Sequence, residues 1–181
     1  MAILDIEAIA DRYYADLYRF GLSLAKNAED AADLTQNAFF LIAKNQAKIR
    51  DADRAKSWLF TTLYREFLAK NRRAWRMESR EDIELSAEVD ESQPAPSAAH
   101  DSKLVLQCLW QLEEEYRAAL SLFYLEQLSY QEIAEILQIP IGTVMSRLAR
   151  GKQKLRHHLE QADQTEKGRI IPFENPTRRT A

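Results

Sequence analysis

Cations without neighbouring carboxylates are concentrated in the stretch "SYQEIAEILQIPIGTVMSRLARGKQKLRHHL", which runs from Ser129 to Leu159. They follow a short break at Pro140 and Gly142, in a chain whose formal net charge is −3. The cations are Arg147, Arg150, Lys152, Lys154 and Arg156. Guanidinium and ammonium groups neutralise phosphates and release bound counterions. The chemistry that this stretch indicates is therefore nucleic-acid binding.

The same stretch has the pattern of two helices joined by a turn. Ser129 and Glu132 form an S-x-x-E capping box, which predicts a helix start. Pro140 suits the first position of the second helix, because its missing N–H breaks no bond there. One face of that helix is apolar, with Val144, Leu148, Gly151 and Leu155. The opposite face carries Thr143, Ser146, Arg150 and Gln153, with Arg147 and Lys154 at its edge. Such a helix fits a DNA major groove; the alternative is a surface helix whose charges only keep it soluble.

A second basic segment lies between Arg65 and Arg76, with five bases and one acid. Aromatic side chains alternate with these bases, and aromatic rings can stack on unpaired bases while cations hold the backbone. The candidate residues for single-stranded DNA are Arg65, Lys70, Arg72, Arg73 and Trp75. The alternative is that the aromatic residues belong to a core and the bases only reach solvent; for Trp58 we favour the core.

Hydrophobic periodicity predicts an all-α protein with two small helical domains. Helices are expected at 5–26, 28–44 and 54–73, then from Ser102 to about 112 and over 114–126. The domains are placed at 1–76 and 102–160, with a mobile tail at 161–181. The connector at 77–101 has eight acids and one base from Glu78 to Asp101. It is either a solvated spacer or an anionic segment that lies in a cationic channel of a partner.

Several classes of function receive no support from the residues. Cys108 is the only cysteine, so an internal disulfide is excluded and a buried thiol is expected. No histidine pairs with it at zinc-ligand spacing, and no phosphate-binding glycine loop is present. We therefore expect no enzyme, no metal and no cofactor. The sequence has no signal-peptide pattern and no apolar run of about 18 residues, so a soluble cytoplasmic protein is expected.

Three segments, in order along residues 5 to about 160, resemble bacterial RNA polymerase sigma factors of the extracytoplasmic-function group. "AADLTQNAF" is similar to the acidic helix with which that family docks on polymerase. "KSWLFTTLYREFLAKNRR" resembles the segment that melts and reads the −10 element. "LSYQEIAEILQIPIGTVMSRLARGKQKL" resembles the helix-turn-helix that reads the −35 element, and "IPIGTVMSRL" is the most specific match.

The resemblance implies a role for each group of matching residues. Polymerase docking is implied for Asp33, Gln36 and Phe39. Contact with the −10 element is implied for Trp58, Leu59, Arg72 and Arg73, in the segment that also carries the candidates Arg65, Lys70 and Trp75. Contact with the −35 element is implied for Thr143, Ser146, Arg147, Arg150 and Lys154. The implied partners are core RNA polymerase, promoter DNA and an anti-sigma factor, with membrane contact only through the latter. The sequence departs from the family pattern at Ala32, Asn37, Arg65, Gln138 and Met145.

Two other functions remain open at this point. A sigma mimic would bind an anti-sigma factor as a decoy and support no transcription. An ordinary helix-turn-helix repressor would bind duplex DNA without polymerase, but it leaves the first 76 residues unexplained. Polymerase binding combined with run-off transcription separates the three.

Overall fold

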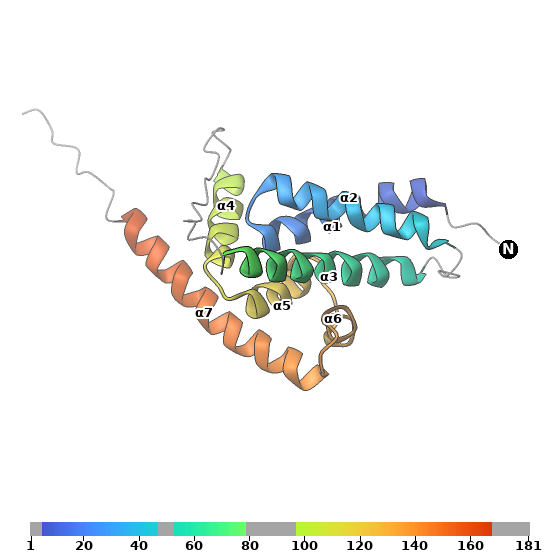
Figure 1. Cartoon of the computed structure of the whole chain (residues 1–181). Coiled ribbons are helices and arrows are strands. Elements are labelled where there is room, and N and C mark those ends of the chain that lie inside the picture. Colours follow the sequence, from blue (N-terminus) through green and yellow to red (C-terminus); the bar gives the residue numbers. More distant parts are fainter. Residues whose placement is uncertain (1–4, 47–52, 79–96, 168–181) are drawn as a thin grey trace, which may run out of the picture.

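The computed structural model describes residues 5–46, 53–78 and 97–167, and within these ranges it contains seven helices and no strand. The helices are α1 (Ile6–Ala25), α2 (Ala28–Lys44), α3 (Asp53–Glu78), α4 (Ser97–Trp110), α5 (Glu114–Tyr124), α6 (Tyr130–Leu137) and α7 (Ile141–Lys167). The predicted all-α fold is confirmed. We call α1–α3 the first half of the chain and α4–α7 the second half (Figure 1).

In the first half, α1 and α2 lie side by side and α3 packs against both (Figure 1). Side-chain oxygens cap both N-termini: Asp5 accepts from the Ala8 N–H at 3.0 Å, and Asn27 accepts from the Asp30 N–H at 2.8 Å. These caps satisfy N–H groups that the first turn leaves without helical partners. The core between the three helices is apolar, and Phe20 and Phe60 meet in it with ring centroids 5.5 Å apart.

In the second half, the predicted capping box is confirmed at the start of α6. The Glu132 N–H donates to Ser129 Oγ at 3.3 Å, and the Ser129 N–H donates to Glu132 Oε2 at 2.8 Å. Pro140 lies one position earlier than predicted. Its carbonyl accepts the first helical bond of α7, from Val144 at 3.1 Å, so it is the N-cap residue. Proline is tolerated there for the predicted reason, because the backbone N–H of an N-cap residue makes no hydrogen bond within the helix.

Helix boundaries differ from the predictions by more than two residues at three places. α4 begins at Ser97, so Ser102 lies inside the helix and does not cap it. α3 and α7 continue to Glu78 and Lys167, past the predicted ends. The last turns of α3 and α7 are polar, and polar residues do not mark a helix end unless Gly or Pro follows. The prediction used the apolar periodicity, so it ended both helices too early. Residues 79–96 of the acidic connector and 168–181 of the tail lie outside the described residues.

The turn between α6 and α7 holds a non-glycine residue in a left-handed conformation. Gln138 has φ 56° and ψ 46° as the C-cap of α6, a position where glycine is unstrained. We expect Gln138→Gly to raise the free energy of unfolding by about 0.5–1 kcal/mol. In contrast, Gln153→Gly on the exposed face of α7 is expected to lower it by about 1 kcal/mol. Denaturant titration measures the free energy of unfolding of both variants. If Gln138→Gly lowered it as Gln153→Gly does, the left-handed backbone at Gln138 would not be strained.

The close approach of α7 to α5 depends on Gly151. A Cβ added there would lie 3.0 Å from Leu120 Cδ1 and 3.2 Å from Tyr116 Cβ, whereas one added at Gly142 would meet nothing within 4 Å. Alanine improves helix propensity at both sites, so the two variants differ mainly by the crowding. We expect Gly151→Ala to be less stable than Gly142→Ala by about 1–3 kcal/mol in thermal or denaturant unfolding. Equal stabilities would show that Leu120 moves aside freely.

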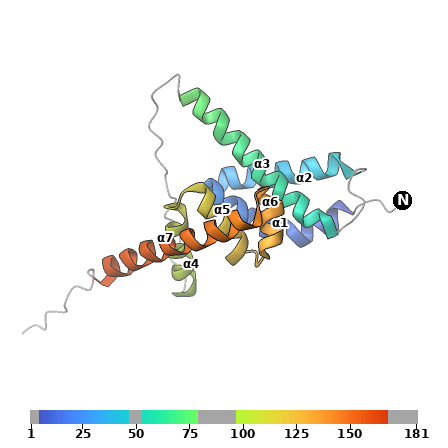
Figure 2. The same cartoon turned by 90° about the horizontal axis from the view of Figure 1, so that it is seen from below.

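The two halves pack on one another. α5 lies against α1, and α6 lies against α3, so that buried residues of both halves form one continuous apolar core. Figure 1 shows α7 running along the outside of this assembly, beneath α5 and α6, and in Figure 2 its C-terminal part projects beyond the other helices. α7 is therefore anchored to the second half by one face and leaves its opposite face to solvent.

Candidate nucleic-acid interface

The two faces of α7 divide as predicted. Val144 and Leu148 are buried against α5 and α6, and Gly151 is buried beside them. On the other side, Ser146 and Arg150 are exposed. The Ser146 hydroxyl donates to the Thr143 carbonyl at 2.9 Å, and Thr143 itself is half-buried. Ser146 and Arg150 therefore project from a helix that the core holds rigidly, as groups that read a major groove must.

Two other predicted DNA cations of α7 are already ion-paired with carboxylates at the start of α5 or just before it. Arg147 contacts Glu115 Oε2 at 3.1 Å and is only 20% exposed, while Lys154 pairs with Glu113. Glu113 also shows the effect of this contact, because the hydrogen bond from Lys154 lowers the pKa of its carboxyl. A phosphate that binds Arg147 or Lys154 has to compete with these carboxylates. No ion pair to Arg150 occurs within the described ranges, so an anionic ligand at this residue would face no such competition.

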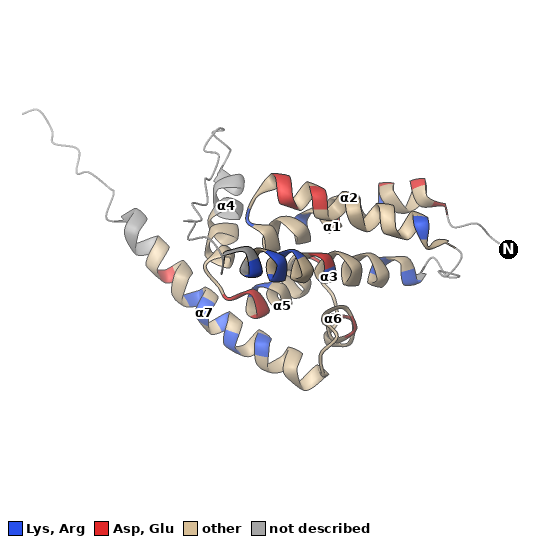
Figure 3. Cartoon of the chain, in the orientation of Figure 1, with Lys and Arg blue, Asp and Glu red and all other residues tan. Residues whose placement is uncertain are grey.

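The cations of α3 form the second candidate surface. Arg65, Arg72 and Arg73 are exposed, and Figure 3 shows the basic residues gathered toward the C-terminal end of α3. Lys70 is different, since it pairs with Asp30 of α2. Burial acts to raise the pKa of Asp30, but hydrogen bonds from Asn27 and Lys70 outweigh it, and the pKa is lowered. Lys70 therefore tethers α3 to α2. The side chain of Trp75 lies outside the described residues.

A groove of about 600 Å³ adjoins this surface where α3 meets the start of α5. Leu68 supplies an apolar wall, Arg72 and Arg76 supply charge, and Asn71 donates to Glu114 Oε2 across the groove at 2.8 Å. An apolar wall beside guanidinium groups can hold a flat ring next to a phosphate. The groove is thus chemically suited to one unstacked base of a single strand.

The predicted polymerase-docking residues separate into two environments on α2. Asp33 and Gln36 are exposed on one face, whereas Phe39 is half-buried and stacks on Tyr14 of α1 at 6.0 Å between ring centroids. Phe40, which sequence reasoning missed, is 63% exposed and follows Asp33 and Gln36 at helical spacing. The seven-residue step from Asp33 to Phe40 was the signal that could have found it. Phe39 supports this face from beneath, and Phe40 is part of it.

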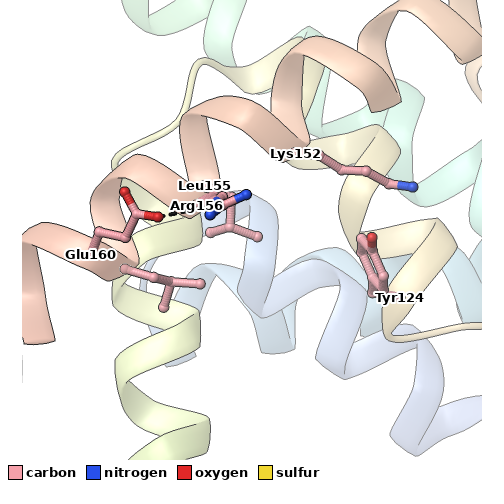
Figure 4. Close-up of a pocket in the computed structure, with 6 residues that line it drawn as sticks. Tyr124, Lys152, Leu155, Arg156 and Glu160 are labelled. Carbon is pink, nitrogen blue, oxygen red and sulfur yellow. Dashed lines mark hydrogen bonds and ion pairs between the residues drawn. The ribbon is translucent and has the colours of Figure 1, made fainter.

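A second apolar groove lies between the end of α5 and the C-terminal part of α7 (Figure 4). It has a volume of about 420 Å³ and is lined by Tyr124, Leu155 and Leu159, with Lys152 and Arg156 at its edge. Lys152 lies over the Tyr124 ring, with Nζ 5.6 Å from the centroid, and Arg156 is ion-paired with Glu160 at 2.8 Å. An apolar floor with a basic edge suits an amphipathic helix with acidic flanks.

Cys108 is buried, as predicted, and burial raises the pKa of its thiol. In the part of the chain that the structure describes, no three His, Cys, Asp or Glu side chains gather as metal ligands would. The same residues include no helix with the length and hydropathy needed to cross a bilayer. The candidate sites on the described part of the chain are therefore cationic and apolar contact surfaces.

Comparison with known proteins places both halves in one family. The family described as Sigma-70 region 2 matches residues 9–77, and Sigma-70, region 4 matches residues 102–155. The chain is 35% identical over 153 residues to the ECF RNA polymerase sigma factor SigE of Mycolicibacterium smegmatis, covering 82% of this chain but 59% of SigE. It is 30% identical over 154 residues to the ECF RNA polymerase sigma factor SigM of Bacillus subtilis, covering 84% of this chain and 94% of SigM.

Among solved structures, the sigma factor RpoE of Bartonella quintana, crystallised with the anti-sigma factor NepR, has a similar fold. Its TM-score is 0.73 at 26% identity, covering 85% of this chain and 98% of RpoE. The match thus spans both halves of the chain. Because both family models match and a relative that is 30% identical aligns over 84% of its length, the chain belongs to the extracytoplasmic-function family of RNA polymerase sigma factors.

Proposed function

We propose that this sigma factor binds core RNA polymerase through the exposed face of α2 and contacts promoter DNA at two separate places. Asp33, Gln36 and Phe40 meet the polymerase. Arg65, Arg72 and Arg73 of α3, together with Trp75, hold the opened strand of the −10 element. Ser146 and Arg150 of α7 enter the major groove of the −35 element, flanked by Thr143, Arg147 and Lys154 on the DNA backbone.

The observation that carries this proposal is the two-faced geometry of α7. Its apolar stripe is fixed against α5 and α6, so Ser146 and Arg150 face solvent from a rigid support. Base-edge readout needs a side chain that is held in place but free to donate, and Arg150 offers a bidentate pair of donors to guanine. The exposed arginines of α3 provide the second, sequence-tolerant contact.

The proposed division of labour follows the chain. Residues 1–76 dock on polymerase and contact the −10 element, and residues 102–160 contact the −35 element. The acidic connector between α3 and α4 acts as a tether whose negative charge complements a cationic path in the polymerase, and no role is assigned to the residues that follow α7. The protein guides polymerase and makes or breaks no bond itself. Since polymerase is a cytoplasmic enzyme, the protein works there.

An anti-sigma factor is the proposed regulatory partner. RpoE, which this chain resembles over both halves, was crystallised with the anti-sigma factor NepR. The groove formed by Tyr124, Leu155 and Leu159 provides a surface on which an amphipathic helix of such a partner fits. In this proposal the acidic flank of that helix contacts Lys152 and Arg156.

Polymerase capture combined with run-off transcription tests the proposed function. The expected result is that the purified chain binds core polymerase and starts transcription at defined promoters, whose start sites sequencing identifies. A decoy would bind an anti-sigma factor and yield no transcript. A repressor would bind duplex DNA equally well with and without polymerase. Either result would replace the sigma-factor role.

A further inference from the structure

Two large apolar side chains at the start of α7 are left outside the core. Ile141 is 47% exposed and Met145 is 53% exposed, and neither belongs to the apolar core or to the partly buried residues that pack on it. α7 begins at Ile141, so both residues lie in its first two turns. A single exposed apolar residue is ordinary on a protein surface, but two neighbours on one helix face offer a partner apolar area to bury.

The helical repeat places these two residues in a row that adjoins the proposed −35 contacts. Ile141, Met145 and Ala149 follow one another at four-residue spacing, and all three are exposed. Ser146 and Arg150 form the neighbouring row, which is shifted by one residue. At about 100° per residue, Met145 and Ala149 lie on the same side of Ser146. The solvent face of α7 therefore carries an apolar row beside a polar one.

The two edges of this face differ in charge. Arg147 lies on the far side of the polar row, is paired with Glu115, and is the only charged residue from Ile141 to Ala149. On the side of the apolar row, Lys152 follows further along α7, and its Nζ lies 5.1 Å from the Phe123 ring centroid. At the start of α7 the apolar row thus has no charge with which to hold a phosphate. The group that it contacts is therefore apolar.

An apolar row in this position fits one feature of the major groove. A helix with its side chains is about 10–12 Å across, and the groove is about 12 Å wide. When Ser146 and Arg150 face the base edges, the adjoining row lies inside the same groove, and the groove walls leave no room for a protein on that edge. N-terminal residues of a recognition helix are those that reach base edges. Among the four bases, thymine alone presents an apolar group there, its C5-methyl.

We propose that Met145 reads a thymine of the −35 element through its C5-methyl group, and that Ile141 and Ala149 extend the apolar surface around this contact. The proposal rests on the proposed function, because it requires α7 to enter the −35 major groove. It adds a second kind of base recognition to that of Arg150, since Met145 selects a base without a hydrogen bond. The unbranched side chain of methionine adapts its shape to the methyl group that it covers.

Replacing thymine by deoxyuridine tests this contact, because it removes the C5-methyl and keeps every hydrogen bond of the base pair. Each thymine of a cognate −35 element, on either strand, is replaced singly. Fluorescence anisotropy then measures the affinity of the sigma–polymerase complex for the labelled promoter. The parent protein is expected to bind about threefold to fivefold more weakly when one particular thymine is replaced, the effect of one buried methyl group. Equal affinity for all these promoters, or a −35 element without thymine on either strand, would overturn the proposal.

Two substitutions of Met145 show whether this side chain makes the contact. Met145→Gln keeps the length of the side chain but ends in an amide, so it is expected to bind the thymine and deoxyuridine promoters equally. Met145→Leu is apolar and of similar volume, and it is expected to retain the difference. Both change an exposed residue, so the fold should be unaffected. If Met145→Gln still distinguished the two promoters, or weakened binding to both by the same factor, Met145 would not read the methyl group.

Arg150→Ala is the matched control in the neighbouring row. It is expected to bind every promoter more weakly but to keep the difference of about threefold to fivefold between thymine and deoxyuridine. Loss of that difference in this variant too would assign the methyl effect to the general position of α7 and overturn the proposal. The proposed function fails in another way: no change of any −35 base would then alter binding by the parent protein. A parent protein with −35 base preferences but no response to deoxyuridine would refute the methyl contact alone.

Discussion

Replacing Arg150 by alanine is expected to reduce transcription from a cognate promoter by about ten- to a hundredfold. This corresponds to the loss of about 1–3 kcal/mol of −35 binding, the contribution of one bidentate contact to a base. The substitution removes an exposed side chain, so the fold and polymerase binding should be unaffected. Run-off transcription on promoters with each −35 base varied measures the effect. The variant should lose preference at one position, and unchanged discrimination at every position would remove the proposed role of Arg150.

Arg156→Ala is the matched control on the same helix. Arg156 is 82% exposed and is paired with Glu160 one turn later, at the edge of the groove that contains Tyr124. Its removal takes the same charge from α7 without touching the face that holds Ser146 and Arg150. We expect transcription within about twofold of the parent protein, because a distant rim charge contributes little. A loss as large as that of Arg150→Ala would indicate a non-specific charge effect.

Reversing the charge at Asp33 is expected to have the second large effect. Asp33→Arg should weaken binding to core polymerase by about tenfold or more, since an anionic docking surface then presents a like charge to its partner. Asp33 is exposed on α2, so the melting temperature should change little. Fluorescence anisotropy with labelled sigma factor and core polymerase measures the affinity. Normal holoenzyme formation would remove Asp33 from the interface.

Glu135→Arg provides the control for the change in net charge. Glu135 is exposed on α6 in the other half of the chain, so its reversal alters the total charge equally. We expect polymerase affinity close to that of the parent protein. If both reversals weaken binding alike, the attraction is long-range and Asp33 makes no specific contact.

Local patterns predicted much of the fold and part of the site. The period of α7 identified its buried stripe and its exposed face, because these follow from the helical repeat alone. The capping box at Ser129 is equally local, as its two partners are three residues apart. The helix ends were less predictable, since α7 continues to Lys167 through polar residues that carry no stop signal.

Contacts between distant residues could not be predicted. Arg147 and Lys154 were expected to face DNA, but they are paired with Glu115 of α5 and with Glu113 just before it, which lie far away in the sequence. The stacking of Phe39 on Tyr14 of α1 likewise could not be predicted, although the helical spacing from Asp33 does place Phe40 on the exposed face. No sequence pattern identified Arg117 as a donor to the end of α1, because the Leu24 carbonyl that it binds lies 93 residues earlier in the chain. Each of these contacts depends on how helices pack against one another, and the hydrophobic periodicity of a single helix does not predict that packing.

Mapping DNA crosslinks from two positions of the chain within one polymerase–promoter complex tests the central claim most directly. A photoreactive side chain is placed at Ser146 of α7 in one variant and at Arg65 of α3 in another, and the crosslinked bases are identified by sequencing. Contact at two places predicts crosslinks from Ser146 in the −35 element and from Arg65 in the opened −10 strand, about 25 base pairs, or about 85 Å, apart. Crosslinks from both positions to the same few base pairs, or none from Ser146, would contradict it.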